Sequence, residues 1–154
     1  MKARTVVLTL VTLFVGLTMC FAQNPNLGTW KLNEAKSKLG AGLPKNLTVK
    51  YEAVGDKIKA TVDGVDGQGT PTHNEWTGKF DGKDYPVTGD PTSDARAIKQ
   101  IGDRTLELTV KKGGKVTMTG RIVVAADGKS RTLTASGTDS MGMKVEGTSV
   151  YDKQ

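Results

Sequence analysis

From Gly28 onward, apolar and polar residues alternate in short runs, and this alternation constrains the fold more than any other feature of the chain. Turn-forming pairs such as Asp–Gly and Gly–Gly end each run after roughly 8–12 residues, which is typical of all-β proteins. Glycine adopts the positive φ of tight hairpins at little cost. The single helical pattern is residues 33–39, where Asn33 is placed to cap a short helix ending at Gly40.

The runs predict ten strands joined by short connections. Their expected ranges are residues 28–32, 47–53, 58–63, 73–80, 85–88, 94–101, 104–111, 115–126, 130–138 and 142–152. Sequential strands should pair as an antiparallel meander, and closing the sheet removes both unpaired edges. We therefore predict an all-β chain, an antiparallel up-and-down β-barrel of about 8–10 strands with one short helix after the first strand. A two-layer sandwich is the alternative.

The alternation also assigns an apolar interior and a polar outer surface. The candidate ligand-binding residues of this interior are Val49, Tyr51, Ile58, Trp76, Tyr85, Leu106, Leu108, Met118, Met143 and Tyr151. Val116 falls on the same predicted face. Beyond residue 22 the chain has one Phe, two Trp and three Tyr, so the interior is expected to be small or simply filled.

Residues 1–22 have the three parts of an export signal. Lys2 and Arg4 precede an apolar stretch, and small residues flank a cleavage site after Ala22. The stretch is shorter than the roughly 20 residues that span a bilayer. The sequence predicts a signal peptide at 1–22 and a lipocalin-like barrel domain at 23–154, in an exported chain that is periplasmic or secreted.

Cys20 is the only cysteine and offers an alternative to simple cleavage, a lipid anchor. Met19 is not the small residue that normally precedes an acylated cysteine. After cleavage no cysteine remains, which excludes disulfides and thiolate sites. The net charge of +6 falls by two, because the leader holds Lys2 and Arg4 and no acidic residue.

Gly28 and Trp30 on the first strand, a short helical segment and ten strands resemble the calycin superfamily of lipocalins and fatty-acid-binding proteins. The resemblance implies a bacterial exported lipocalin-like protein with a binding role. It also implies that Gly28 and Trp30 close one end of the barrel with an arginine from a late strand. Arg121 is our candidate for that closing arginine, with Arg131 as the other choice.

The resemblance fails in the last strand. The Arg-x-Tyr of fatty-acid-binding proteins falls on Ser149 and Tyr151, so the carboxylate-anchoring arginine is absent from that position. A fatty-acid site is therefore not carried over.

The sequence has few residue patterns typical of metal, catalytic or nucleic-acid-binding sites. His73 is the only histidine and has no partner at metal or catalytic spacing. Residues 63–69 are rich in Asp and Gly but lack the ligand spacing of a calcium loop. Lysines are interleaved with acidic residues, so no nucleic-acid partner is expected. We predict no metal, no cofactor and no catalytic residue.

These observations favour a non-enzymatic, monomeric binding protein with no transmembrane segment in its mature form. A small apolar or amphipathic ligand would lie in the barrel, with Tyr51, Tyr85 and Tyr151 as polar contacts and Arg121 as a weaker one. The alternative is a structural or interaction protein of the cell envelope with a filled barrel. An enzyme on the same scaffold is the third hypothesis.

Overall fold

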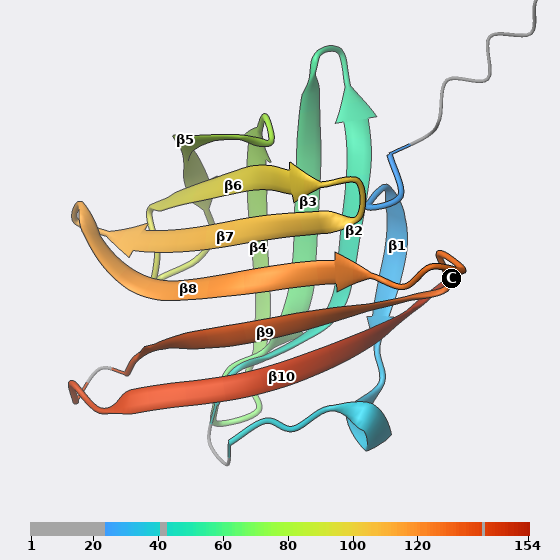
Figure 1. The fold of residues 1–154 in the computed structure, drawn as a ribbon. Coiled ribbons are helices and arrows are strands. Elements are labelled where there is room, and N and C mark those ends of the chain that lie inside the picture. Colours follow the sequence, from blue (N-terminus) through green and yellow to red (C-terminus); the bar gives the residue numbers. More distant parts are fainter. Residues whose placement is uncertain (1–23, 41–42, 140) are drawn as a thin grey trace, which may run out of the picture.

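The chain folds as a closed ten-stranded antiparallel barrel, as the alternation predicts (Figure 1). The computed structural model describes residues 24–40, 43–139 and 141–154, so the predicted signal peptide and Cys20 lie outside the described residues. The strands are β1 (Gly28–Leu32), β2 (Lys45–Val54), β3 (Lys57–Val65), β4 (Pro71–Gly78), β5 (Asp81–Thr88), β6 (Ala95–Gly102), β7 (Thr105–Lys112), β8 (Lys115–Val124), β9 (Ser130–Thr138) and β10 (Lys144–Lys153).

Each strand pairs with its neighbour in sequence, and β1 pairs with β10 to close the barrel. Gly113 and Gly114 show why the connections can be so short. Their φ angles of 55° and 76° form the tight turn between β7 and β8, in a region that other residues rarely adopt. No helix of the described ranges is long and apolar enough to cross a membrane.

The predicted helix is shorter than expected, a single 3-10 turn η1 (Glu34–Lys36). Asn33 does cap it, because its Oδ1 accepts a hydrogen bond from the Lys36 amide at 3.1 Å. The turn stops before Gly40 because Ser37 is extended, and its Oγ accepts from the Val150 amide at 2.9 Å. Lys38 then bridges to Thr148, so the backbone joins the last strand instead of continuing as helix.

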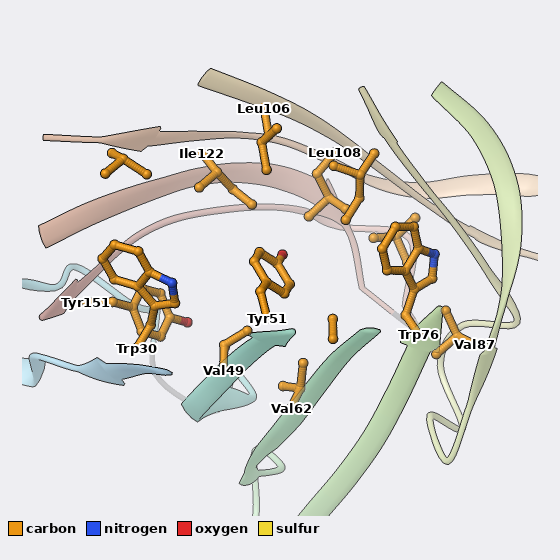
Figure 2. Packing of buried hydrophobic residues seen from close by; sticks show 14 residues of the cluster. Trp30, Val49, Tyr51, Val62, Trp76, Val87, Leu106, Leu108, Ile122 and Tyr151 are labelled. Atoms are coloured by element: carbon orange, nitrogen blue, oxygen red, sulfur yellow. The ribbon is translucent and has the colours of Figure 1, made fainter. Parts of the chain in front are cut away.

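Fourteen buried residues form one apolar cluster inside the barrel. Ten of them are labelled in Figure 2: Trp30, Val49, Tyr51, Val62, Trp76, Val87, Leu106, Leu108, Ile122 and Tyr151. Ile58, Tyr85 and Met118 are partly buried and pack against this cluster. Nine of the ten predicted interior residues thus lie in or against the core.

Two residues assigned to the interior are instead exposed. Met143 is 55% exposed, because β10 begins only at Lys144 and Met143 belongs to the preceding loop. Val116 is also 55% exposed. A register shift in the β7–β8 ladder pairs Val116 with Lys111 and so turns it to the outer face.

Candidate functional site

Trp30 is fully buried, and the arginine that lies over its ring is Arg131. The guanidinium carbon of Arg131 lies 4.8 Å from the Trp30 ring centroid, and Lys153 Nζ lies 5.0 Å from it. The indole Nε1 donates to the Asn26 carbonyl at 2.9 Å. Our choice of Arg121 is wrong, since Arg121 is exposed on the outer face.

Arg131 is enclosed by three aromatic rings. Besides Trp30, the rings of Tyr51 and Tyr151 have their centroids 4.9 Å and 5.2 Å from its guanidinium carbon. Cation–π attraction of this kind strengthens when the cation is desolvated. β9 turns Arg131 inward because it pairs with Val124 of β8 and Tyr151 of β10, two core residues.

The guanidinium of Arg131 lacks a counter-ion within the described part of the chain. Arg131 is only 3% exposed, yet its Nε and Nη1 have no hydrogen-bond partner there, and no carboxylate forms an ion pair with it. Burial lowers the pKa of Arg131, while Tyr51 and Tyr151 oppose that shift. An arginine nevertheless keeps its charge in a protein. The barrel therefore holds a desolvated positive charge with unused donors.

A second arginine, Arg96, points into the same interior from β6. It pairs with Val110 of β7, and its side chain is 14% exposed. Its Nη2 donates to Asn74 Oδ1 at 3.4 Å and lies 3.9 Å from Asp90 Oδ2, while its Nε lacks a partner in the described ranges. Burial lowers the pKa of Arg96, opposed by Tyr51 and Asp90.

Tyr51 connects the two arginines electrostatically, since it acts on the pKa of both. In Figure 2 it lies between the Trp30–Tyr151 pair and Trp76, with its hydroxyl toward the middle of the barrel. Tyr151, the other tyrosine against Arg131, has its pKa raised by burial. The Tyr151 hydroxyl therefore stays protonated near pH 7 and can donate or accept a hydrogen bond.

The interior beyond Tyr51 is filled by aromatic rings. Phe80 stacks on Trp76 with centroids 6.3 Å apart, and Tyr85 meets Trp76 edge-on at 5.9 Å. Gly78 makes this packing possible, because a Cβ at that position would lie 2.5 Å from the Tyr85 ring. Tyr85 turns its hydroxyl outward to Asp81 Oδ2 at 2.9 Å, so it does not supply the interior polar contact that we expected.

Asp90 is the acid nearest to this interior, and its own loop satisfies it. Ser93 Oγ donates to its Oδ2 at 2.6 Å, and Thr92 donates to its Oδ1 from both amide and hydroxyl. Burial opposes ionisation, yet these hydrogen bonds and the charge of Arg96 hold the pKa of Asp90 below its usual value. Asp90 is thus an anion that only partly offsets Arg96.

The prominent hollows lie outside the apolar core. One of about 900 Å³ is an open groove lined largely by outward side chains of β7–β10, including Arg121, Thr134 and Glu146. Another of about 390 Å³ is lined by Leu39, Gly40 and Leu43 on one side and by residues of the β3–β4 loop on the other. Side chains of the apolar cluster occupy the barrel interior.

His73 lies on the barrel surface. Its Nδ1 is 2.6 Å from Asp63 Oδ1 and its Nε2 is 3.9 Å from Glu75 Oε1, with the imidazole 58% exposed. No group of three metal-ligating side chains gathers around it or elsewhere among the described residues.

Sequence reasoning missed Arg96. Arg96 lies two residues before the core residue Ile98, so the two share a strand face. This spacing indicated an interior position for Arg96, but charged residues were assigned by default to the outside. Asn74, 8% exposed and hydrogen-bonded to Arg96, was missed as well, although it lies two residues before Trp76 on the same strand face.

Comparisons with known proteins support the fold. No protein-family model and no curated protein sequence matches the chain. Among solved structures, it is similar to that of EF1p2_mFAP2b bound to DFHBI, with a TM-score of 0.50 and 10% sequence identity. The match covers 84% of this chain and 94% of that one. The likeness shows that the chain shares its barrel fold with a protein that was solved with a small molecule.

Proposed function

We propose that this chain is an exported binding protein whose barrel holds a small amphipathic molecule with an anionic group. The observation that carries the proposal is Arg131, buried with two unused guanidinium nitrogens and without a carboxylate partner in the described structure. Burying an uncompensated charge costs several kcal/mol, and native proteins rarely leave such donors unmade. A bound anion between Arg131 and Arg96 would supply the missing acceptors.

The filled interior limits the size of this ligand. The apolar cluster extends from Trp30 to Trp76, so a long hydrocarbon chain would have to displace core side chains. A short apolar body with a carboxylate, sulfonate or phosphate head fits the chemistry better. Charge-assisted hydrogen bonds, which are about twice as strong as neutral ones, would then contribute more to affinity than apolar area.

The solved structure bound to DFHBI supports the use of such a barrel for a small molecule, although at 10% identity it says nothing of which one. The export half of the proposal rests on the residue pattern of 1–22.

A filled barrel of the cell envelope, acting through its surface, is the second candidate. The observation that favours it is the position of the large groove, which lies on the outer face of β7–β10. On this hypothesis ordered water would satisfy Arg131, and the interior would bind nothing else.

Native mass spectrometry of the protein purified from its own host separates the two. The proposal predicts a bound anionic molecule that denaturation releases, on a chain that begins at Gln23. An Arg131→Met variant should be recovered without the adduct, whereas the matched surface variant Arg121→Met should retain it. A ligand-free wild-type chain would favour the filled barrel.

A further inference from the structure

Three large apolar side chains are exposed together at one end of the barrel. Met141 is 76% exposed, and Met143 and Val116 are each 55% exposed. They come from two adjoining connections, the β9–β10 loop and the start of β8. Met118 of β8 pairs with Gly137 of β9. Val116 lies two residues before Met118, and the β9–β10 loop begins two residues after Gly137, so Val116 and the loop lie at the same end of the barrel. Scattered exposed apolar residues are ordinary, but two exposed methionines in one loop and an exposed valine at the start of the neighbouring strand indicate a contact surface.

The loop holds both methionines outward by a defined turn. The Asp139 carboxylate accepts hydrogen bonds from the amides of Met141 and Met143, each at 2.9 Å. The Asp139 amide donates to the Met143 carbonyl at 2.9 Å, which closes the loop at its base. The carboxylate is thereby turned into the loop, and the thioether side chains form the tip.

Lysines surround these side chains. Lys112 and Lys115 flank the β7–β8 turn, and Lys144 follows Met143 directly. All three are exposed, and none forms an ion pair within the described ranges. Two carboxylates at this end of the barrel accept hydrogen bonds from backbone amides, Asp139 as above and Asp94 from the Gly113 amide at 2.8 Å. Figure 1 shows the β7–β8 and β9–β10 turns on the same side of the barrel.

We propose that this hairpin-tip patch, defined by Val116, Met141, Met143, Lys112, Lys115 and Lys144, docks on an anionic lipid surface. Apolar side chains that enter the headgroup boundary, ringed by cations that meet acidic lipids, are the combination by which proteins lie on such membranes. Methionine suits this role because its flexible thioether adapts to an irregular apolar environment. This surface is independent of the interior arginines and does not rest on the proposed ligand.

The test uses the chain beginning at Gln23, which contains every described strand and lacks the apolar leader. Sedimentation with phosphatidylcholine vesicles, with and without phosphatidylglycerol, measures the partition coefficient. We expect at least tenfold stronger partition onto the vesicles with phosphatidylglycerol. Met141→Ser with Met143→Ser should lower it about tenfold, and Lys→Gln at all three lysines should abolish the lipid preference.

Val54 provides the matched control, because it is 52% exposed on the β2–β3 hairpin at the opposite end. Val54→Ser should leave partition unchanged, and circular dichroism should show the same fold in every variant. Equal partition onto both vesicles, no partition, or a double methionine variant that binds like the parent would each overturn the proposal. So would sedimentation velocity showing a dimer that the methionine substitutions dissociate, because the patch would then bind a second copy.

Discussion

Replacing Arg131 with methionine separates a binding role for this arginine from a purely structural one. The substitution removes the guanidinium but keeps a long apolar side chain between Trp30, Tyr51 and Tyr151. The lost cation–π contacts, at 4.8–5.2 Å from three ring centroids, are worth about 0.5–2 kcal/mol each. In the wild type, Nε and Nη1 of Arg131 lack hydrogen-bond partners among the described residues, which costs about 1–3 kcal/mol for each atom. The substitution removes both atoms and therefore removes this cost.

The opposing contributions are therefore of similar size. A methionine sulfur near the rings restores about 0.3–1.5 kcal/mol more. We expect the ligand-free Arg131→Met variant to have an unfolding free energy within about 1 kcal/mol of wild type, or higher, because apolar replacement of buried charges is often neutral or stabilising.

Urea unfolding followed by tryptophan fluorescence measures this difference, with Arg121→Met as the surface control. A loss above about 3 kcal/mol, in the range seen when a well-compensated buried group is removed, would refute the reasoning. Arg131 would then serve to close the barrel, and its unused donors would carry no functional meaning.

Three further results are expected. Gly78→Ala should lower the free energy of unfolding by about 1–3 kcal/mol, because its Cβ would clash with Tyr85. Gly102→Ala is the control, since its Cβ would meet nothing closer than 3.7 Å, and it should be nearly neutral in the same urea titration. Equal stability of the two variants would contradict this prediction. The pKa of Asp90 is lower in the folded state than in the unfolded chain, so ionised Asp90 stabilises the fold above about pH 4 and this stabilisation is lost as the pH falls. Asp90→Asn should therefore make the free energy of unfolding depend less on pH in acid. An unchanged slope of unfolding free energy against pH would contradict this prediction. N-terminal sequencing of the exported protein should begin at Gln23; an intact 1–22 segment or a lipidated Cys20 would contradict cleavage after Ala22.

The barrel could be predicted from the sequence because its signals are local. Period-two alternation and Asp–Gly or Gly–Gly turns act within one hairpin, and ten hairpin-linked strands leave closure as the way to remove both edges. The capping role of Asn33 could be predicted for the same reason, because it depends only on the residues that follow it directly. The end of η1 depends on Ser37 and Val150, which lie far apart in sequence, and this contact was not foreseeable.

Alternation within one strand did carry a signal for the interior charges, because Arg131 shares a strand face with Leu133 and Arg96 with Ile98. The strand pairing agrees with this alternation: Arg121 lies opposite Glu107, and Arg131 lies beside Val124. A shift in the β7–β8 ladder moved Val116 outward. The rule that charged residues lie outside concealed Arg96 and its Nε, which has no partner among the described residues.

Calorimetric titration with butanoate and with butan-1-ol tests most directly whether the buried guanidinium recognises an anion. The two molecules share a short apolar chain and differ in charge. Wild type should bind butanoate in a one-to-one complex at least tenfold more tightly than the alcohol, and Arg131→Met should lose that preference while Arg121→Met keeps it. Equal affinity for acid and alcohol in wild type, or an unchanged preference in Arg131→Met, would contradict a binding role for the buried arginine.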